Sequence, residues 1–125
     1  MQRILIIDDE EAVVEMLAEF LSARNYDISR AYDGGEGVQK FDSDMPDIVM
    51  CDINMPQKDG FEFLREIRSS RKWVPVIIVS GLSEPANIMK GYDLEADYYL
   101  TKPINLEETL KAIQIMLSLA PLRKQ

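Results

Sequence analysis

The chain has 125 residues, the length of one ordinary domain that can bury a hydrophobic core. Hydrophobic residues make up 46% and charged residues 29% of it, a globular balance that excludes a disordered chain. The formal net charge of −8 argues against direct binding of nucleic acid, because a phosphate backbone requires an excess of Lys and Arg.

Short apolar runs alternate with helical patterns from the N-terminus onward. We expect strands at Arg3–Ile7, Asp27–Ala31, Ile48–Cys51, Val76–Val79 and Asp97–Leu100. Three of these runs are rich in Val, Ile and Leu with little alternation, which is typical of strands covered on both faces.

Helical periodicity fills the intervals between these runs. The first helix has an apolar stripe at helical spacing, made of Val13, Met16, Leu17, Phe20 and Leu21. Weaker patterns cover Gly35–Asp42 and Gly60–Ser69, and Ser83 and Pro85 suit the first turn of a helix that runs to about Lys90. The last stripe consists of Leu106, Leu110, Ile113 and Leu117, with Asn105 as N-cap and Glu108 three residues later. Five strands that alternate with five helices predict an α/β domain with a parallel sheet.

Cys51 is the only cysteine, so no internal disulfide can form. It lies in an apolar run, where burial as a small hydrophobic side chain is the ordinary outcome, and this usage fits the cytoplasm. The apolar run at residues 3–7 is too short for a signal peptide or a membrane span. We therefore expect a soluble cytoplasmic protein that contacts no membrane.

Chemically complementary residues follow four of the predicted strands. Sites in open α/β sheets form at the carboxyl ends of the strands, and the residues found there are Asp8, Asp9, Asp52, Ser80, Thr101, Lys102 and Pro103. Each has an ordinary explanation when taken singly: acids favour the start of a helix, Asp52 could form a turn, and Lys102 could be a surface lysine. Their convergence on one edge of the sheet favours a functional site.

The chemistry of such a site is that of phosphoryl transfer. Crowded carboxylates require a cation or a raised pKa, and oxygen ligands in a chain without histidine favour Mg²⁺ over Zn²⁺. Lys102 supplies a positive charge for a phosphate oxygen, and the Ser80 hydroxyl can donate to another. A carboxylate can itself accept a phosphoryl group, a reaction that requires mainly positioning and charge neutralisation.

Four motifs together resemble the receiver domains of two-component response regulators. They are Asp8-Asp9, the D-x-x-M-P-x-x-D-G string from Asp52 to Gly60, Ser80, and Lys102-Pro103. The resemblance covers essentially the whole chain in order and spacing. It implies a flavodoxin-like fold, with a five-stranded parallel sheet in the order 2-1-3-4-5 and five helices on both faces. The receiver domain would span residues 1–120, and residues 121–125 would be a tail or the start of a linker to an output domain outside this sequence.

The resemblance also implies a role for each site residue. Asp52 would be the phosphoacceptor, and Mg²⁺, or Mn²⁺ in its place, would be held by Asp8, Asp9, Asp52 and the backbone carbonyl of Asn54. Lys102 would contact the phosphoryl group, and its bond to Pro103 would be cis. Ser80 would be the switch hydroxyl, and Tyr99 would swing inward with it.

The implied partner is a sensor histidine kinase or a histidine phosphotransfer protein. Phosphorylation would shift a two-state equilibrium and remodel the face made by the fourth helix, fifth strand and fifth helix, which would also offer a surface for a homodimer. The domain would be a signalling switch that takes part only in its own Mg²⁺-dependent phosphorylation and dephosphorylation, not an enzyme.

The chain departs from the family pattern at Glu95, which replaces a glycine, and at Tyr98, which replaces an aspartate. Tyr98 and Tyr99 alternate along a strand, so one of the two should face outward. An outward tyrosine suggests a protein contact, although packing against a neighbouring helix is an equal alternative.

Three other functions fit these residues less well. A phosphatase of the haloacid dehalogenase type needs a titratable acid where this chain has Asn54. An interaction module with a decayed site would not keep Asp8, Asp9, Asp52, Ser80 and Lys102 together. Nucleotide binding at Asp33–Gly37 lacks the G-x-G-x-x-G spacing, and this segment is an ordinary turn and helix start.

Overall fold

Apolar runs and polar helix starts alternate along the chain, and the folded chain follows this pattern closely. The computed structural model describes residues 1–55, 58–70, 73–81 and 96–123. Its elements in chain order are β1 (Arg3–Ile7), α1 (Glu11–Ser22), β2 (Asp27–Ala31), α2 (Gly34–Asp44), β3 (Ile48–Asp52), α3 (Gly60–Ile67), β4 (Val76–Ser80), β5 (Tyr98–Thr101) and α5 (Leu106–Arg123).

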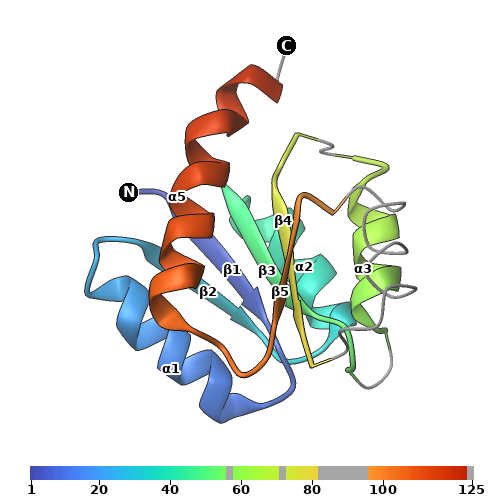
Figure 1. Cartoon of the computed structure of the whole chain (residues 1–125). Coiled ribbons are helices and arrows are strands. Elements are labelled where there is room, and N and C mark those ends of the chain that lie inside the picture. Colours follow the sequence, from blue (N-terminus) through green and yellow to red (C-terminus); the bar gives the residue numbers. More distant parts are fainter. Residues whose placement is uncertain (56–57, 71–72, 82–95, 124–125) are drawn as a thin grey trace.

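The five strands form one parallel sheet in the order β2-β1-β3-β4-β5. Figure 1 shows α1 and α5 on one face of this sheet and α2 and α3 on the other. The predicted flavodoxin-like α/β fold is therefore confirmed. The helix expected from Ser83 and Pro85 to Lys90 lies outside the described residues, as does Glu95.

The core has two layers because β1, β3 and β4 bury side chains on both faces. On one face, Leu5, Val49 and Ile78 pack with Phe41 of α2 and Phe63 of α3. The two phenyl rings meet edge to face, with their centroids 6.2 Å apart. On the other face, the strands pack against apolar residues of α1 and α5, among them Leu17, Leu21, Ile113 and Leu117. Cys51 is buried in the first of these layers, as its apolar surroundings predict.

Side-chain caps begin three of the helices. Asp33 accepts a hydrogen bond from the Glu36 N–H at the start of α2, and Asp59 and Glu62 form a reciprocal capping box at the start of α3. Asn105 accepts from the Glu108 N–H at 2.9 Å, as predicted for α5. Each of these helices begins shortly after the carboxyl end of the preceding strand.

Three strand ends differ from the predicted ones by one residue. Asp52, Ser80 and Thr101 are the last residues of their strands rather than the first residues after them, because Asp52 pairs with Val79 and Ser80 pairs with Thr101. Asp97 precedes β5 instead of beginning it, since its carboxylate accepts from the Val76 N–H at 2.7 Å. Polar residues at these ends continue the backbone ladder, which an apolar pattern does not reveal.

Two helical predictions need correction. Met16 fits the apolar stripe of the first helix, yet it is 40% exposed, and the buried residues of α1 are Val14, Leu17, Ala18 and Leu21. The apolar stripe of the last helix ends at Leu117, yet α5 runs on to Arg123 and contains Pro121. Leu117, about one turn before Pro121, and Ala120, directly before it, are both buried. This packing holds the last turn of the helix, although proline donates no backbone hydrogen bond. Among the described helices, none combines the length and the apolar character needed to cross a membrane.

Candidate functional site

Three acids from two strand ends lie together at the carboxyl edge of the sheet. Asp8 and Asp9 follow β1, Asp52 ends the neighbouring β3, and one carboxylate oxygen from each lies within 4.8 Å of the others. Asp8 and Asp52 are only 3% and 5% exposed, whereas Asp9 is open to solvent. The parallel sheet thus brings together acids that are more than forty residues apart in the sequence.

Lys102 places a positive charge against these acids. Its Nζ lies 3.0 Å from Asp8 Oδ2, 3.2 Å from Glu10 Oε1 and 3.7 Å from Asp52 Oδ2. Burial alone would lower the pKa of Lys102, but its hydrogen bond to Asp8 and the charge of Asp52 raise it, so the side chain stays protonated. The residue that follows β5 therefore supplies the cation that the carboxyl ends of β1 and β3 lack.

Sequence reasoning missed the contribution of Glu10. Its pattern indicates only an acidic helix start, but its carboxylate accepts from Lys102 Nζ. The signal that could have found it is its position two residues after Asp8, whose carboxylate also accepts from the Glu10 N–H at 2.9 Å. Because the Glu10 side chain is 63% exposed, it contacts Lys102 from the solvent side of the site.

Burial makes Asp52 an unusual carboxyl group. Burial and the nearby charge of Asp8 raise the pKa of Asp52 from 3.8 to about 6, and Lys102 offsets only part of this. Near neutral pH the group is an ionised carboxylate whose charge is poorly compensated by the protein. Such a group favours a bound cation.

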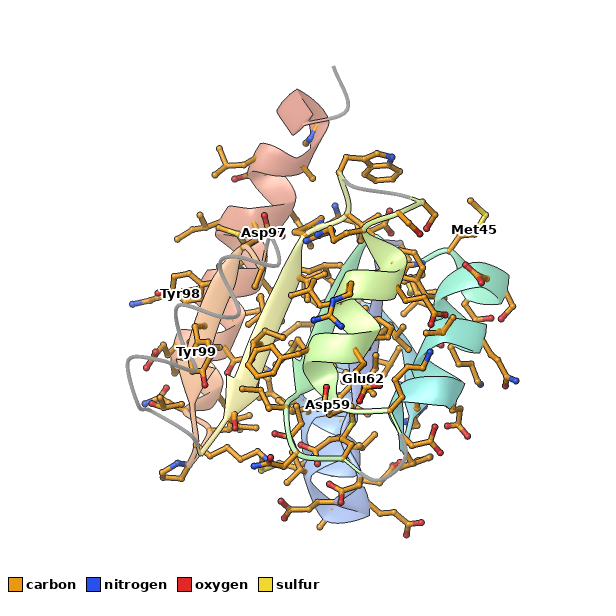
Figure 2. The ribbon with its side chains drawn as sticks, turned by 90° about the vertical axis from the view of Figure 1, so that its right-hand side faces the viewer. Met45, Asp59, Glu62, Asp97, Tyr98 and Tyr99 are labelled. Atoms are coloured by element: carbon orange, nitrogen blue, oxygen red, sulfur yellow. The ribbon has the colours of Figure 1, made fainter. Side chains whose placement is uncertain are left out.

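Ser80 and Tyr99 connect the site to the edge strand. Ser80 ends β4 and is fully buried, and Tyr99 of the adjacent β5 is partly buried against the core. Burial raises the pKa of the Tyr99 hydroxyl, while a side-chain hydrogen bond with Ser80 lowers it. The two predicted switch residues are therefore already in contact. Figure 2 shows Tyr98 and Tyr99 along β5, and Tyr98 is 39% exposed.

The remaining predicted residues flank this cluster. Asn54 is exposed and lies two residues beyond Asp52, in the segment that leaves β3. Thr101 is exposed at the end of β5, and the bond between Lys102 and Pro103 is cis. None of the predicted site residues lies outside the described part of the chain.

The donor set fits a hard divalent cation. All the candidate ligands are carboxylate or carbonyl oxygens, which Mg²⁺ prefers. Asp8 and Asp52 are buried acids, and among the described residues Lys102 is the cation paired with both of them. Asp8, Asp9, Asp52 and the Asn54 carbonyl are the groups that would hold the ion, which would supply positive charge for phosphate oxygens.

Comparison with known proteins agrees with this geometry. The family model of the response regulator receiver domain matches residues 4–114. The response regulator MprA of Mycobacterium ulcerans (strain Agy99) is 37% identical over 115 residues, which cover 92% of this chain and 50% of that protein. The chain thus spans about half the length of the curated relatives that it matches.

Solved structures show the same similarity over nearly the whole chain. A CheY-like receiver domain protein from Methanospirillum hungatei JF-1 has a TM-score of 0.93 and 28% identity, with 97% of each chain covered. The chemotaxis protein CheY4 of Vibrio cholerae has a TM-score of 0.88 and 30% identity, with 93% of this chain and 98% of that chain covered. Sequence, fold and site geometry lead to the same conclusion: this chain belongs to the receiver domain family of two-component response regulators.

Proposed function

We propose that Asp52 accepts a phosphoryl group from a phosphohistidine donor in an Mg²⁺-dependent reaction. The observation that carries this proposal is the meeting of Asp8, Asp52 and Lys102 from three different strand ends within hydrogen-bonding or ion-pairing distance. A buried carboxylate beside a cation site and a protonated lysine has both the nucleophile and the positive charges that phosphoryl transfer requires.

The bonds that form and break in this reaction belong to Asp52 and the donor. An Asp52 carboxylate oxygen forms a bond to phosphorus, the phosphorus–nitrogen bond of the phosphohistidine breaks, and the imidazole of the donor leaves as the neutral base after protonation. Lys102, now bound to Asp8 and Glu10, would turn toward a new phosphate oxygen. Mg²⁺, or Mn²⁺ in its place, would neutralise the added charge.

The contact between Ser80 and Tyr99 supports a route from this event to the surface. The Ser80 hydroxyl would donate to the phosphoryl group and release its bond with Tyr99, which would then occupy the space that Ser80 leaves. The face formed by the fourth helix, β5 and α5 would change in consequence. Phosphorylation in this scheme biases an existing equilibrium between two arrangements.

The partners follow from this role. The donor would be a sensor histidine kinase or a histidine phosphotransfer protein, and the domain would work beside it in the cytoplasm. Because the relatives are about twice as long, an output domain would lie beyond the receiver domain at residues 1–120. Residues 121–125, the first of which still lie in α5, would lead into the linker. The switching face would also pair two copies of the chain. With a net charge of −8, this domain would not itself bind nucleic acid.

The chain would act as a switch rather than as an enzyme that turns over foreign phosphoesters. Asn54 stands where a phosphatase of the haloacid dehalogenase type would need an acid, and an amide cannot donate and recover a proton. Hydrolysis would then be limited to the phosphoryl group on Asp52.

The test is labelling with the small phosphodonor acetyl phosphate, with Mg²⁺ and with EDTA, followed by intact-protein mass spectrometry. We expect the mass of one phosphoryl group to be added in Mg²⁺ and nothing to be added in EDTA. Asp52→Asn should remain unlabelled, while Asp42→Asn, which changes an exposed acid of α2 outside the cluster, should label like the wild type. Labelling of Asp52→Asn would exclude Asp52 as the acceptor.

A further inference from the structure

Two adjacent glycines at the start of α2 have very different surroundings. A methyl group added to Gly34 would lie 2.1 Å from the carbonyl oxygen of Lys58 and 2.7 Å from its Cβ. A methyl group added to Gly35 would meet only the Asp33 carboxylate, at 3.3 Å. Gly34 therefore touches the backbone that precedes α3 so closely that only a glycine fits there, whereas Gly35 has room for a side chain.

The backbone that Gly34 touches is itself pressed against Asp52. We call residues 58–60 the α3 corner. At its far end, the Gly60 N–H donates to the Ile53 carbonyl at 3.0 Å. A methyl group on Gly60 would lie 2.3 Å from the Asp52 carbonyl oxygen. A chain of direct backbone contacts thus runs from α2 through the α3 corner to Asp52.

The α3 corner has little freedom to absorb a displacement. Asp59 accepts from the Glu62 N–H at 2.9 Å, and the Glu62 carboxylate accepts from the Asp59 N–H at 3.3 Å. Lys58 also forms an ion pair with Glu66 of α3, but this pair is open to solvent and contributes little to holding the corner. Figure 2 shows Asp59 and Glu62 close together at the N-terminal end of α3. Movement of Lys58 would accordingly be transmitted to Gly60 and to Asp52.

We infer that Gly34 is a positioning residue for the metal site, because the start of α2 holds Asp52 in place through the α3 corner. Asp8 and Asp9 follow β1, so a shift of the Asp52 backbone on β3 would separate ligand atoms that now lie within 4.8 Å. The inference rests on the proposed function, since it takes Asp52 to be a ligand of Mg²⁺.

The test compares Gly34→Ala with Gly35→Ala in the full, unphosphorylated chain. Both substitutions exchange glycine for alanine in the first turn of the same helix, so their intrinsic effects on α2 match. We expect calorimetric titration with Mg²⁺ to give a Kd about tenfold higher for Gly34→Ala, the usual size of an effect on ligand support, and an unchanged Kd for Gly35→Ala. Amide hydrogen exchange at Gly60 should be faster in Gly34→Ala alone.

The unfolding free energies of both variants, measured in urea without Mg²⁺, show how much stability each substitution costs. Because the Kd is measured on folded protein, a higher Kd in Gly34→Ala reports a displaced site and not a loss of stability. Equal Mg²⁺ affinity in the two variants, beside a wild type that binds Mg²⁺ and labels at Asp52, would overturn the inference and leave the proposed function standing. A wild type that fails to bind Mg²⁺ would overturn the proposed function instead.

A second pair of variants keeps the test decisive if Gly34→Ala does not fold. Lys58→Gly loosens the α3 corner without adding an atom, and Glu66→Gln breaks the same ion pair without touching the backbone. We expect weaker Mg²⁺ binding in Lys58→Gly and wild-type binding in Glu66→Gln. Wild-type binding in both would overturn the inference.

Discussion

The buried, ionised carboxylate of Asp52 lowers the stability of the folded chain, and a functional site can retain such a cost. Its pKa of about 6 in the metal-free protein, against 3.8 for an ordinary aspartate, means that the folded chain holds a proton that the unfolded chain has already released. The folded state therefore binds more protons between about pH 4 and pH 6, and its stability falls as the pH rises through this window. Above pH 6 the whole cost is present.

The substitution Asp52→Asn should remove this cost. In EDTA at pH 7.5 we expect the variant to be more stable than the wild type by about 1 to 2 kcal/mol, a value reduced for the solvent that reaches the site beside Asp9. The difference should vanish at pH 4, where the wild-type carboxyl group is protonated. Urea unfolding at both pH values measures it, and a difference that does not depend on pH would show that the charge of Asp52 is not its cause.

The two adjacent tyrosines of β5 should contribute very differently to the stability of the fold. Tyr98 is 39% exposed, whereas Tyr99 is packed against the core. We expect Tyr98→Ala to change the unfolding free energy by less than about 0.5 kcal/mol, as surface substitutions usually do, and Tyr99→Ala to cost about 1 to 3 kcal/mol. Urea unfolding measures both.

The contact role of Tyr98 has a separate readout. We expect Tyr98→Ala to weaken self-association of the phosphorylated chain or binding to its kinase, measured by sedimentation and by calorimetry, because exposed aromatic side chains favour interfaces. If Tyr98→Ala binds its partner and itself as tightly as the wild type, the outward tyrosine is not a protein contact.

At the scale of elements, α2 ends in an unfavourable conformation. Met45 follows the helix with φ 48°, a left-handed conformation that side chains other than Asn, Asp and Gly rarely adopt, and Figure 2 shows it projecting at the end of the helix. Asn25, after α1, has a similar φ of 69° but is a residue suited to it. We expect Met45→Asn to stabilise the domain by about 0.5 to 1 kcal/mol. Urea unfolding should show a loss for the control, Asn25→Ala, and a loss for Met45→Asn would contradict the prediction.

A buried ion pair joins α3 to the start of β5. Arg68 donates to Asp97 at 2.9 Å and to the Val74 carbonyl at 2.7 Å, and the two charged side chains are only 6% and 18% exposed. We expect Arg68→Met to cost about 2 to 4 kcal/mol, because it leaves the Asp97 charge with one partner fewer in a poorly solvated place.

The control for Arg68→Met is an exposed pair of almost equal length. Arg30 and Glu15 lie 3.0 Å apart, with side chains that are 39% and 59% exposed. Arg30→Met should cost less than about 0.5 kcal/mol. Thermal unfolding of both variants measures the contrast, and equal losses would show that burial does not set the strength of these pairs.

Elements could be predicted from the sequence where local patterns decide them. The apolar runs located all five strands, and Asn105 located the start of α5. The prediction failed where tertiary contacts decide. Met16 fits the helical period but faces solvent, and Asp52 continues a strand because β4 offers it a partner.

At the scale of the molecule, the site was predictable because parallel strands bring their carboxyl ends to one edge. That rule unites Asp8, Asp52 and Lys102 from their positions in the sequence alone. It could not reveal the bond from Lys102 to Glu10 or the approach of Gly34 to Lys58, since both depend on how loops and helix starts stack on the sheet. Local sequence does not encode such distances.

The whole molecule also carries a net charge of −8, and this bears on how Mg²⁺ should act on its stability. A cation can stabilise an acidic protein by screening repulsion over the whole surface, or by binding the cluster of Asp8, Asp9 and Asp52. Binding at one site stabilises by about 1.4 kcal/mol for each tenfold rise in Mg²⁺ above the Kd. Screening instead depends on ionic strength, whichever salt supplies it.

We expect the wild type to follow the single-site dependence in urea unfolding at pH 7.5, and NaCl at matched ionic strength to give a much smaller gain. Asp52→Asn should respond equally weakly to both salts, so that Mg²⁺ reverses the order of stability found in EDTA. If NaCl stabilises the wild type as much as Mg²⁺ does, screening of the net charge explains the effect. In that case the carboxyl edge of the sheet would not be the place where the cation acts.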